Sequence, residues 1–294
     1  MHNIAILTNS GWQDYQLLDS GDGMKLERFG SYLLARPEAE AIWRRTLSPQ
    51  RWGKADATFI TTAEEHGGHW QTKTALPDQW TIRYGGMVCA LRLSASRHVG
   101  IFPEQAGQWD WISEKVSSAG RAVKVLNLFG YTGLASLAAA QAGAEVTHVD
   151  ASRKVVAWAR ENQQLSGLGD KSIRWIVDDV VKFIEREIRR QNRYDAVILD
   201  PPKFGRGPSG EVWEFYKLIP ELLKACRAVM SERPLFLLLT AYAVKASSLT
   251  LANAVGEMMR DLAGETTTGE VGLVDGAGRI LSMAVFARWS AGGA

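Results

Sequence analysis

The sequence has few of the residues that indicate a disulfide framework, a metal centre or a membrane span. Only two of its 294 residues are cysteines, Cys89 and Cys226. Their number and separation exclude a disulfide framework and a cysteine-rich metal site. The five histidines show no metal-binding spacing. Apolar runs such as Leu235–Leu239 are far shorter than the ~18–20 residues of a membrane span. The chain start has no basic segment followed by an apolar one, so no signal peptide is expected. These absences predict a cytoplasmic protein without metal.

A strong charge of one sign is also missing. The formal net charge is +2, with 11 basic and 12 acidic residues in 1–111 and 23 and 20 in 112–294. Neither part is the strongly basic body that is typical of nucleic-acid-binding domains. A local basic patch remains open.

Residues 1–100 differ in pattern from residues 101–294. The first part alternates short β-like runs with Gly, Asp and Pro turns, which predicts a small, mostly β module, with one short helix over 37–45. Seven of the 11 tryptophans lie within residues 1–111. They either fill the core of this module or stack on bases.

From Lys124 onward, short apolar runs alternate with helical segments, the fourth of them over 211–230. This order predicts an α/β fold with a Rossmann-like, doubly wound, mostly parallel sheet. The turn Asp275-Gly276-Ala277-Gly278 predicts a terminal hairpin. The hairpin adds an antiparallel strand, so the sheet is expected to be mixed.

The segment Lys124–Asp150 organises this second part. It reads as a buried strand, a turn through Gly130 and Gly133, a helix, and a second strand that ends on Asp150. A helix N-terminus offers free N–H groups to an anionic group, and glycines let a ligand approach the backbone. An acid about 20 residues later suits a ribose diol. Alternatively, Asp150 caps the helix that begins near Ser152.

The turn lacks one glycine of the dinucleotide pattern. The missing glycine is the one that admits a pyrophosphate against the backbone. A nucleoside without a pyrophosphate therefore fits better, and S-adenosylmethionine is such a ligand.

Two further acidic segments end predicted strands. In Asp178-Asp179-Val180, we expect Asp179 to contact an adenine amino group and Asp178 to face solvent or cap the next helix; a purely capping role is the alternative. In Asp200-Pro201-Pro202-Lys203-Phe204, two prolines fix the backbone after a strand. Asp200 should then lie beside the nucleoside site, because ligands of open α/β sheets bind at the carboxyl ends of strands.

Together these motifs resemble the class I S-adenosylmethionine-dependent methyltransferases. The similarity is greatest to the branch of bacterial 23S rRNA large-subunit methyltransferases, with its N-L-F-x-Y-T-G loop, D-P-P-K-F motif and F-x-D/E-Q segment, here Phe102–Gln105. The resemblance covers about residues 98–290. It implies an RNA acceptor and the cofactor S-adenosylmethionine.

The resemblance also implies roles for individual residues. Cofactor-binding residues would be Phe102, Gln105, Asn127, Phe129, Gly130, Tyr131, Thr132, Gly133, Asp150, Ala151, Asp179, Val180 and Asp200. The catalytic segment would be Asp200, Pro201, Pro202, Lys203 and Phe204. Lys203 contacts a phosphate, pairs with an acid or is an ordinary surface residue. The loop 205–210 either closes over a substrate or merely connects two elements.

One feature departs from this branch. Its cytosine-5 chemistry needs a cysteine after the fifth strand, where this chain has Leu239-Thr240-Ala241-Tyr242-Ala243. We expect Cys89 and Cys226 to be buried apolar residues. The sequence therefore favours direct transfer to a nitrogen or oxygen nucleophile. A protein or small-molecule acceptor, or a catalytically silent nucleoside- or RNA-binding module, remains an alternative.

Overall fold

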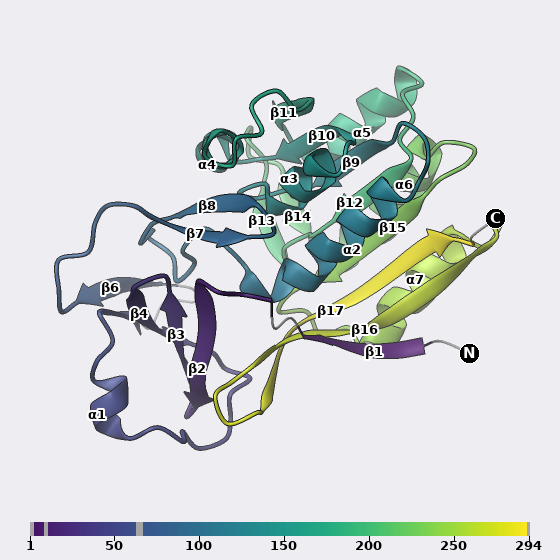
Figure 1. Ribbon diagram of the computed structural model, residues 1–294. Coiled ribbons are helices and arrows are strands. Elements are labelled where there is room, and N and C mark those ends of the chain that lie inside the picture. Colours follow the sequence, from purple (N-terminus) through teal and green to yellow (C-terminus); the bar gives the residue numbers. More distant parts are fainter. Residues whose placement is uncertain (1–2, 9–10, 63–66, 293–294) are drawn as a thin grey trace. The chain divides into compact units, whose positions relative to one another are not determined.

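Two compact units make up the protein, and neither is one continuous segment. The computed structural model describes residues 3–8, 11–62 and 67–292, and Figure 1 shows its ribbon. Unit 1 comprises the residues up to Leu7, Gly107–Val271 and the residues from Ala284 onward. Unit 2 comprises Thr8–Ala106 and Gly272–Met283. The boundary near residue 100 that the sequence suggests stays a prediction.

An eight-stranded sheet forms the centre of unit 1. Its strands, in spatial order, are β1 (Asn3–Thr8), β16 (Gly264–Val274), β17 (Ile280–Ala291), β15 (Phe236–Ala241), β12 (Ala196–Leu199), β9 (Lys124–Leu128), β10 (Glu145–Asp150) and β11 (Ile173–Val177). The five strands from β15 to β11 run parallel, and β17 is antiparallel to β15. The predicted mixed, doubly wound sheet is confirmed. Strand β1, at the sheet edge (Figure 1), was not predicted.

Helices cover both faces of this sheet. The helices α2 (Ala106–Ser117), α3 (Leu134–Gln141) and α4 (Arg153–Leu165) pack on one side, and α5 (Val180–Arg189), α6 (Phe215–Val229) and α7 (Ser248–Met258) on the other. Along β9, Val125 packs in the core beside α2 and α3, whereas Leu126 and Leu128 pack in the core beside α5, α6 and α7. Because both faces are buried, the strands read as continuous apolar runs.

The predicted helix over 211–230 is wrong at its start. Val212–Glu214 forms a strand, β14, which pairs antiparallel with β13 (Phe204–Arg206). The extended backbone places alternate residues on opposite faces, and this turns Trp213 into the core, where it is 5% exposed. Helix α6 begins only at Phe215.

Unit 2 is rich in β-structure, as predicted. A five-stranded sheet contains β2 (Tyr15–Gly21), β3 (Met24–Phe29), β4 (Tyr32–Pro37), β5 (Ala57–Thr61) and β6 (Gly68–Thr72), and a separate pair contains β7 (Trp80–Tyr84) and β8 (Met87–Leu91). The helix expected over 37–45 is absent; a short helix, α1 (Pro49–Trp52), follows instead. The carbonyls of Ala41 and Trp43 accept hydrogen bonds from Gly23 and Asp22 of the β2–β3 turn. This pairing replaces the bonds that a helix would make.

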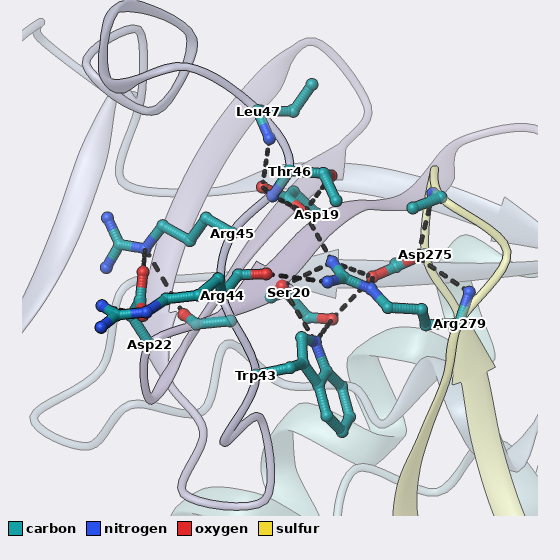
Figure 2. Close-up of polar contacts among 12 residues, drawn as sticks. Asp19, Ser20, Asp22, Trp43, Arg44, Arg45, Thr46, Leu47, Asp275 and Arg279 are labelled. Carbon is teal, nitrogen blue, oxygen red and sulfur yellow. Dashed lines mark hydrogen bonds and ion pairs between the residues drawn. The ribbon is translucent and has the colours of Figure 1, made fainter.

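A buried ionic network joins distant parts of unit 2 (Figure 2). Arg279 donates to Asp19 at 2.9 Å and to Asp275 at 2.8 Å, and Ser20 donates to Asp275 at 2.7 Å. Asp19 and Asp275 are only 0% and 4% exposed. Asp19 also accepts from the hydroxyl of Thr46 at 2.7 Å. These bonds fix the tip of the β16–β17 hairpin within unit 2.

Candidate cofactor and acceptor site

The candidate site lies at the carboxyl ends of β12, β9 and β10. The chain leaves β9 through α3 on one face of the sheet and enters β12 from α5 on the other face. The strand order therefore reverses between β9 and β12, and doubly wound folds bind ligands at such a point. The structure brings the loop 129–133, Asp150 and Asp200 to this one edge of the sheet.

The loop between β9 and α3 has an unusual backbone. Phe129, Tyr131 and Gly133 adopt positive φ angles of 57°, 50° and 89°. Non-glycine residues in this region cost of the order of 1–2 kcal/mol each. Hydrogen bonds from Gly130 N to the Val149 carbonyl at 3.1 Å and from Gly133 N to the Gly130 carbonyl at 3.0 Å hold the loop in this shape.

The two loop glycines are needed for packing inside the protein. A Cβ on Gly130 would lie 2.3 Å from Cε1 of His148. A Cβ on Gly133 would lie 3.0 Å from Ala159 and 3.1 Å from Trp175. Neighbouring side chains therefore occupy the space where each Cβ would point, and the approach of a ligand to these glycines stays a prediction.

A buried polar chain lies beneath the loop. Asn127 Nδ2 donates to Ser136 Oγ at 2.9 Å, and Ser136 Oγ lies 3.0 Å from His148 Nδ1. Asn127 and His148 are 1% and 0% exposed. Burial lowers the pKa of His148 to about 3, against a smaller opposing effect of the Tyr131 backbone. His148 is therefore neutral at physiological pH, and the Asn127 side chain is engaged within the protein.

Asp150 holds the backbone of two segments together. Its Oδ2 accepts from Tyr131 N at 3.0 Å, and its Oδ1 accepts from Ser152 N at 2.9 Å. Burial raises the pKa of Asp150, and these two hydrogen bonds oppose the rise. Ser152, and not Asp150, is the N-cap of α4, because its side chain accepts from Val155 N. Asp150 thus fixes the loop, and Ala151 follows it directly.

Of the two acids after β11, Asp179 has the capping role that was the alternative, whereas Asp178 has a partner that was not expected. Asp179 is the N-cap of α5 and accepts from Lys182 N at 3.0 Å. Asp178, for which solvent or a capping role was expected, forms an ion pair with Arg186. Val180 is buried in the core at the start of α5. A contact of Asp179 with adenine stays a prediction.

Trp213 anchors the Asp200–Phe204 segment. Its Nε1 donates to the Pro202 carbonyl at 2.7 Å, and its ring lies 4.8 Å from the ring of Phe129. Pro201 is buried, whereas Phe204 is 59% exposed with Lys203 Nζ 5.3 Å from its ring centroid. One buried tryptophan therefore contacts both the loop 129–133 and the segment Asp200–Phe204.

The remaining candidate residues are spread over both units. Thr132 is buried, and its carbonyl accepts from Asn162 Nδ2 at 2.9 Å. Phe102, whose ring lies 5.1 Å from that of His98, and Gln105 belong to unit 2. Their contact with the cofactor stays a prediction.

Both cysteines are buried, Cys89 in β8 and Cys226 in α6, and burial raises the pKa of each thiol. Thr240 and Ala241, at the end of β15, are also buried. Among the residues that the structure describes, no group of three or more His, Cys, Asp or Glu side chains could hold a metal ion. His2 and His66 lie outside the described residues.

Sequence reasoning missed the residues that support the loop. Asn127, His148 and Trp175 are register partners on three adjacent strands, and the His148 and Trp175 rings lie 4.6 Å apart. The available signal was a polar residue inside each of two otherwise apolar strands. Such a residue must find a buried partner.

The fold and the site define a nucleoside-binding α/β protein. Its site has two acids, Asp150 and Asp200, at the same edge of the sheet as the loop 129–133. The chain belongs to the S-adenosylmethionine-dependent methyltransferase family, which matches residues 62–251. It is 45% identical to the SAM-dependent methyltransferase from Agrobacterium tumefaciens, whose crystal structure has a TM-score of 0.93 and covers 99% of this chain and 96% of that one.

Curated relatives match shorter segments. The chain is 38% identical over 125 residues to the ribosomal RNA large subunit methyltransferase K/L of Shewanella baltica, and 35% identical over 147 residues to the ribosomal RNA large subunit methyltransferase I of Aeromonas salmonicida. The matches cover 42% and 50% of this chain, but only 16% and 33% of those proteins.

The residues at the switch point fit S-adenosylmethionine. A carboxylate at the end of β10 suits the ribose diol, and the β9–α3 loop lacks one glycine of the pyrophosphate-binding pattern. Asp200 adds a second carboxylate directly after β12, which pairs with β9 on the side opposite β10. This set matches a cationic sulfonium nucleoside better than a dinucleotide.

Proposed function

We propose that this methyltransferase acts on RNA, with ribosomal RNA as the acceptor, in the cytoplasm. The observation that carries the proposal is the exposed Phe204 ring with the half-buried Lys203 beside it, a few residues after the half-buried Asp200 and the buried Pro201 that follow β12. An aromatic ring can stack on a base, and an adjacent lysine can contact a phosphate. The names of the curated relatives support the same acceptor.

The proposed nucleophile is a nitrogen or an oxygen of the acceptor. Attack by the ring carbon of cytosine requires a thiolate, and burial keeps the thiols of Cys89 and Cys226 protonated. An exocyclic amino group or a hydroxyl needs no covalent enzyme intermediate. Direct displacement then depends mainly on alignment.

The chain's own residues would supply this alignment. S-adenosylmethionine, when bound, supplies a methyl group that positive sulfur has already activated. Asp200 and the Pro201 carbonyl would accept hydrogen bonds from the acceptor's amino group, and Phe204 would stack on its ring. Asp150 and the loop 129–133 would hold the cofactor's ribose and amino-acid tail, with Asp179 beside the adenine.

Methyl transfer from tritium-labelled cofactor to rRNA of a deletion strain tests the proposal. We expect label in the RNA, and a methylated nucleoside missing from that strain by mass spectrometry. The Asp150→Ala variant should lose cofactor affinity by ~1–3 kcal/mol, the value of hydrogen bonds to a charged group. Label that enters only protein or small molecules would overturn the RNA acceptor. A protein that binds no cofactor by calorimetry would be the silent nucleoside- or RNA-binding module instead.

A further inference from the structure

The hairpin formed by β13 and β14 has one buried face and one exposed face. Phe204 pairs with Glu214, Gly205 with Trp213, and Arg206 with Val212. Because side chains alternate along a strand and directly paired residues share a face, Phe204, Arg206, Val212 and Glu214 lie on the face opposite Trp213. Phe204 and Val212 are 59% and 58% exposed, and Arg206 is exposed too. We call Phe204, Arg206, Val212 and Glu214, together with Lys203, whose Nζ lies 5.3 Å from the Phe204 ring centroid, the outer hairpin face.

The outer hairpin face carries an excess of positive charge. The two acids of the hairpin already have cationic partners: Glu211 pairs with Lys182, and Glu214 pairs with Lys217 at 2.7 Å. Lys203 lies over the Phe204 ring, and Arg206 stands beside Val212 on the paired strand. Two cations and two exposed apolar side chains therefore lie next to one another on this short hairpin.

The hairpin is firmly attached to the site. Trp213 is held by the Pro202 carbonyl and packs against Phe129, and Phe215 N donates to the Lys203 carbonyl at 3.0 Å. A Cβ on Gly205 would lie 3.3 Å from Pro202 Cγ, so the hairpin fits closely against the proline segment. Whatever binds the outer hairpin face is positioned relative to Asp200.

We infer that the outer hairpin face docks a single-stranded segment of the RNA acceptor. Phe204 stacks on one base, Val212 provides an apolar contact for a neighbouring base, and Lys203 and Arg206 contact phosphates. Stacking on aromatic side chains requires bases that are splayed out of a helix, which favours a loop or a single strand over a duplex. This inference rests on the proposed RNA acceptor and extends it from the target base to its neighbours.

Binding of a fluorescent single-stranded 12-mer RNA to the full chain tests the inference. We expect Arg206→Glu and Val212→Glu each to raise Kd about fivefold or more, with cofactor Kd unchanged, because each adds a negative charge to a phosphate-binding face. Arg206→Gln should reduce the slope of log K against log salt by about 1, the loss of one phosphate contact. The same RNA as a duplex should bind more weakly.

Arg189→Glu is the matched control. Arg189 is exposed in the last turn of α5, near the amino ends of the strands and so at the opposite edge of the sheet from the site. Arg189→Glu changes the net charge of the protein by the same amount as Arg206→Glu. It should change the Kd for RNA by less than about twofold. Equal losses for Arg206→Glu and Arg189→Glu would overturn the inference, because they would indicate unspecific attraction.

Two further outcomes separate the inference from the proposed function. If Arg206→Glu and Val212→Glu both still bound and methylated the RNA normally, the inference would be overturned and the proposed function would stand. A wild-type protein that methylates only protein or small molecules would overturn the proposed function as well. A wild-type dimer that Val212→Glu converts to a monomer in sedimentation would assign the outer hairpin face to a second copy of the chain.

Discussion

At the scale of single residues, His148 explains why the loop before α3 needs Gly130. The His148 ring fills the space beside the Gly130 Cα and is held by Ser136 on one side and Trp175 on another. The Gly130 backbone itself lies outside the left-handed region. An alanine is therefore excluded by the histidine ring and not by backbone strain.

This geometry predicts that removal of the His148 ring relieves the effect of an alanine at position 130. Gly130→Ala should weaken cofactor binding and lower stability by ~1–3 kcal/mol, the cost of overpacking. In Gly130→Ala/His148→Ala the ring that clashes is gone, so the double variant should resemble His148→Ala alone. Calorimetric titration with the cofactor and urea unfolding of all four proteins measure this coupling. Additive losses would show that Gly130 serves another purpose.

The buried histidine also predicts a pH dependence of stability. Because the pKa of folded His148 is lowered to about 3, only the unfolded chain takes up its proton as pH falls below about 6.5. The free energy of unfolding should then decrease from pH 7.5 to pH 5, with a His148 contribution of about 2 kcal/mol. Burial likewise lowers the pKa of His98 to about 3 in unit 2. Urea titrations should show a flatter profile for His148→Gln; an unchanged slope would contradict the assignment.

At the scale of elements, the β13–β14 hairpin does more than connect β12 to α6, because it also supports two segments of the candidate site. Its inner residue Trp213 contacts the first residue after β9 and the prolines after β12. The loop 129–133 and the segment Asp200–Phe204 thereby share one support. If the same residues formed a helix, their side chains would point in different directions around the helix axis, and these contacts would not lie on one face.

Trp213→Phe tests this role. The Phe ring keeps the contact with Phe129 but removes the hydrogen bond to the Pro202 carbonyl, which should cost ~1–2 kcal/mol. We expect lower kcat with cofactor Kd changed less than about twofold, measured by methyl-transfer kinetics and calorimetry. Trp111→Phe is the control, because Trp111 packs against Phe236 away from the loop. A control that lowers kcat equally would argue against a specific support.

At the scale of the whole molecule, residues from both ends of the sequence build unit 2. Ser20 and Asp275 are 255 positions apart and are joined by a 2.7 Å hydrogen bond. Arg279 compensates two buried carboxylates at once, as Figure 2 shows. Asp19 also accepts from Trp52 Nε1 at 2.8 Å, so it keeps partial compensation without the arginine.

Arg279→Ala should therefore destabilise unit 2 strongly. Loss of one partner of a buried pair costs ~3–5 kcal/mol, and the other donors to Asp19 should reduce this to about 2–4 kcal/mol. Urea unfolding followed by tryptophan fluorescence measures it, since Trp43 and Trp52 lie in the network. Arg44→Ala, whose side chain is 94% exposed, should cost less than about 1 kcal/mol. Equal effects of the two variants would contradict the buried role.

Much of unit 1 could be predicted from the sequence. Short apolar runs between amphipathic segments give a parallel sheet, because only strands covered on both faces are apolar throughout. Gly143, with φ of 105°, follows the C-cap of α3, and a glycine at this place is a sequence signal for a helix end. The motif positions also placed Asp150 and Asp200 at the same edge of the sheet, at the ends of the two strands that flank β9, since parallel strands share one carboxyl edge.

Patterns in sequence are local, and this limits what they determine. By itself the sequence determined the alternation of parallel strands and helices in unit 1, the loop at the switch point and the match to a methyl-donor site. Only the tertiary structure decided that His148 requires Gly130, that Trp213 makes 212–214 a strand, and that Arg279 belongs beside Asp19. Each of these depends on a buried partner that is distant in the chain, and burial is set by the fold as a whole.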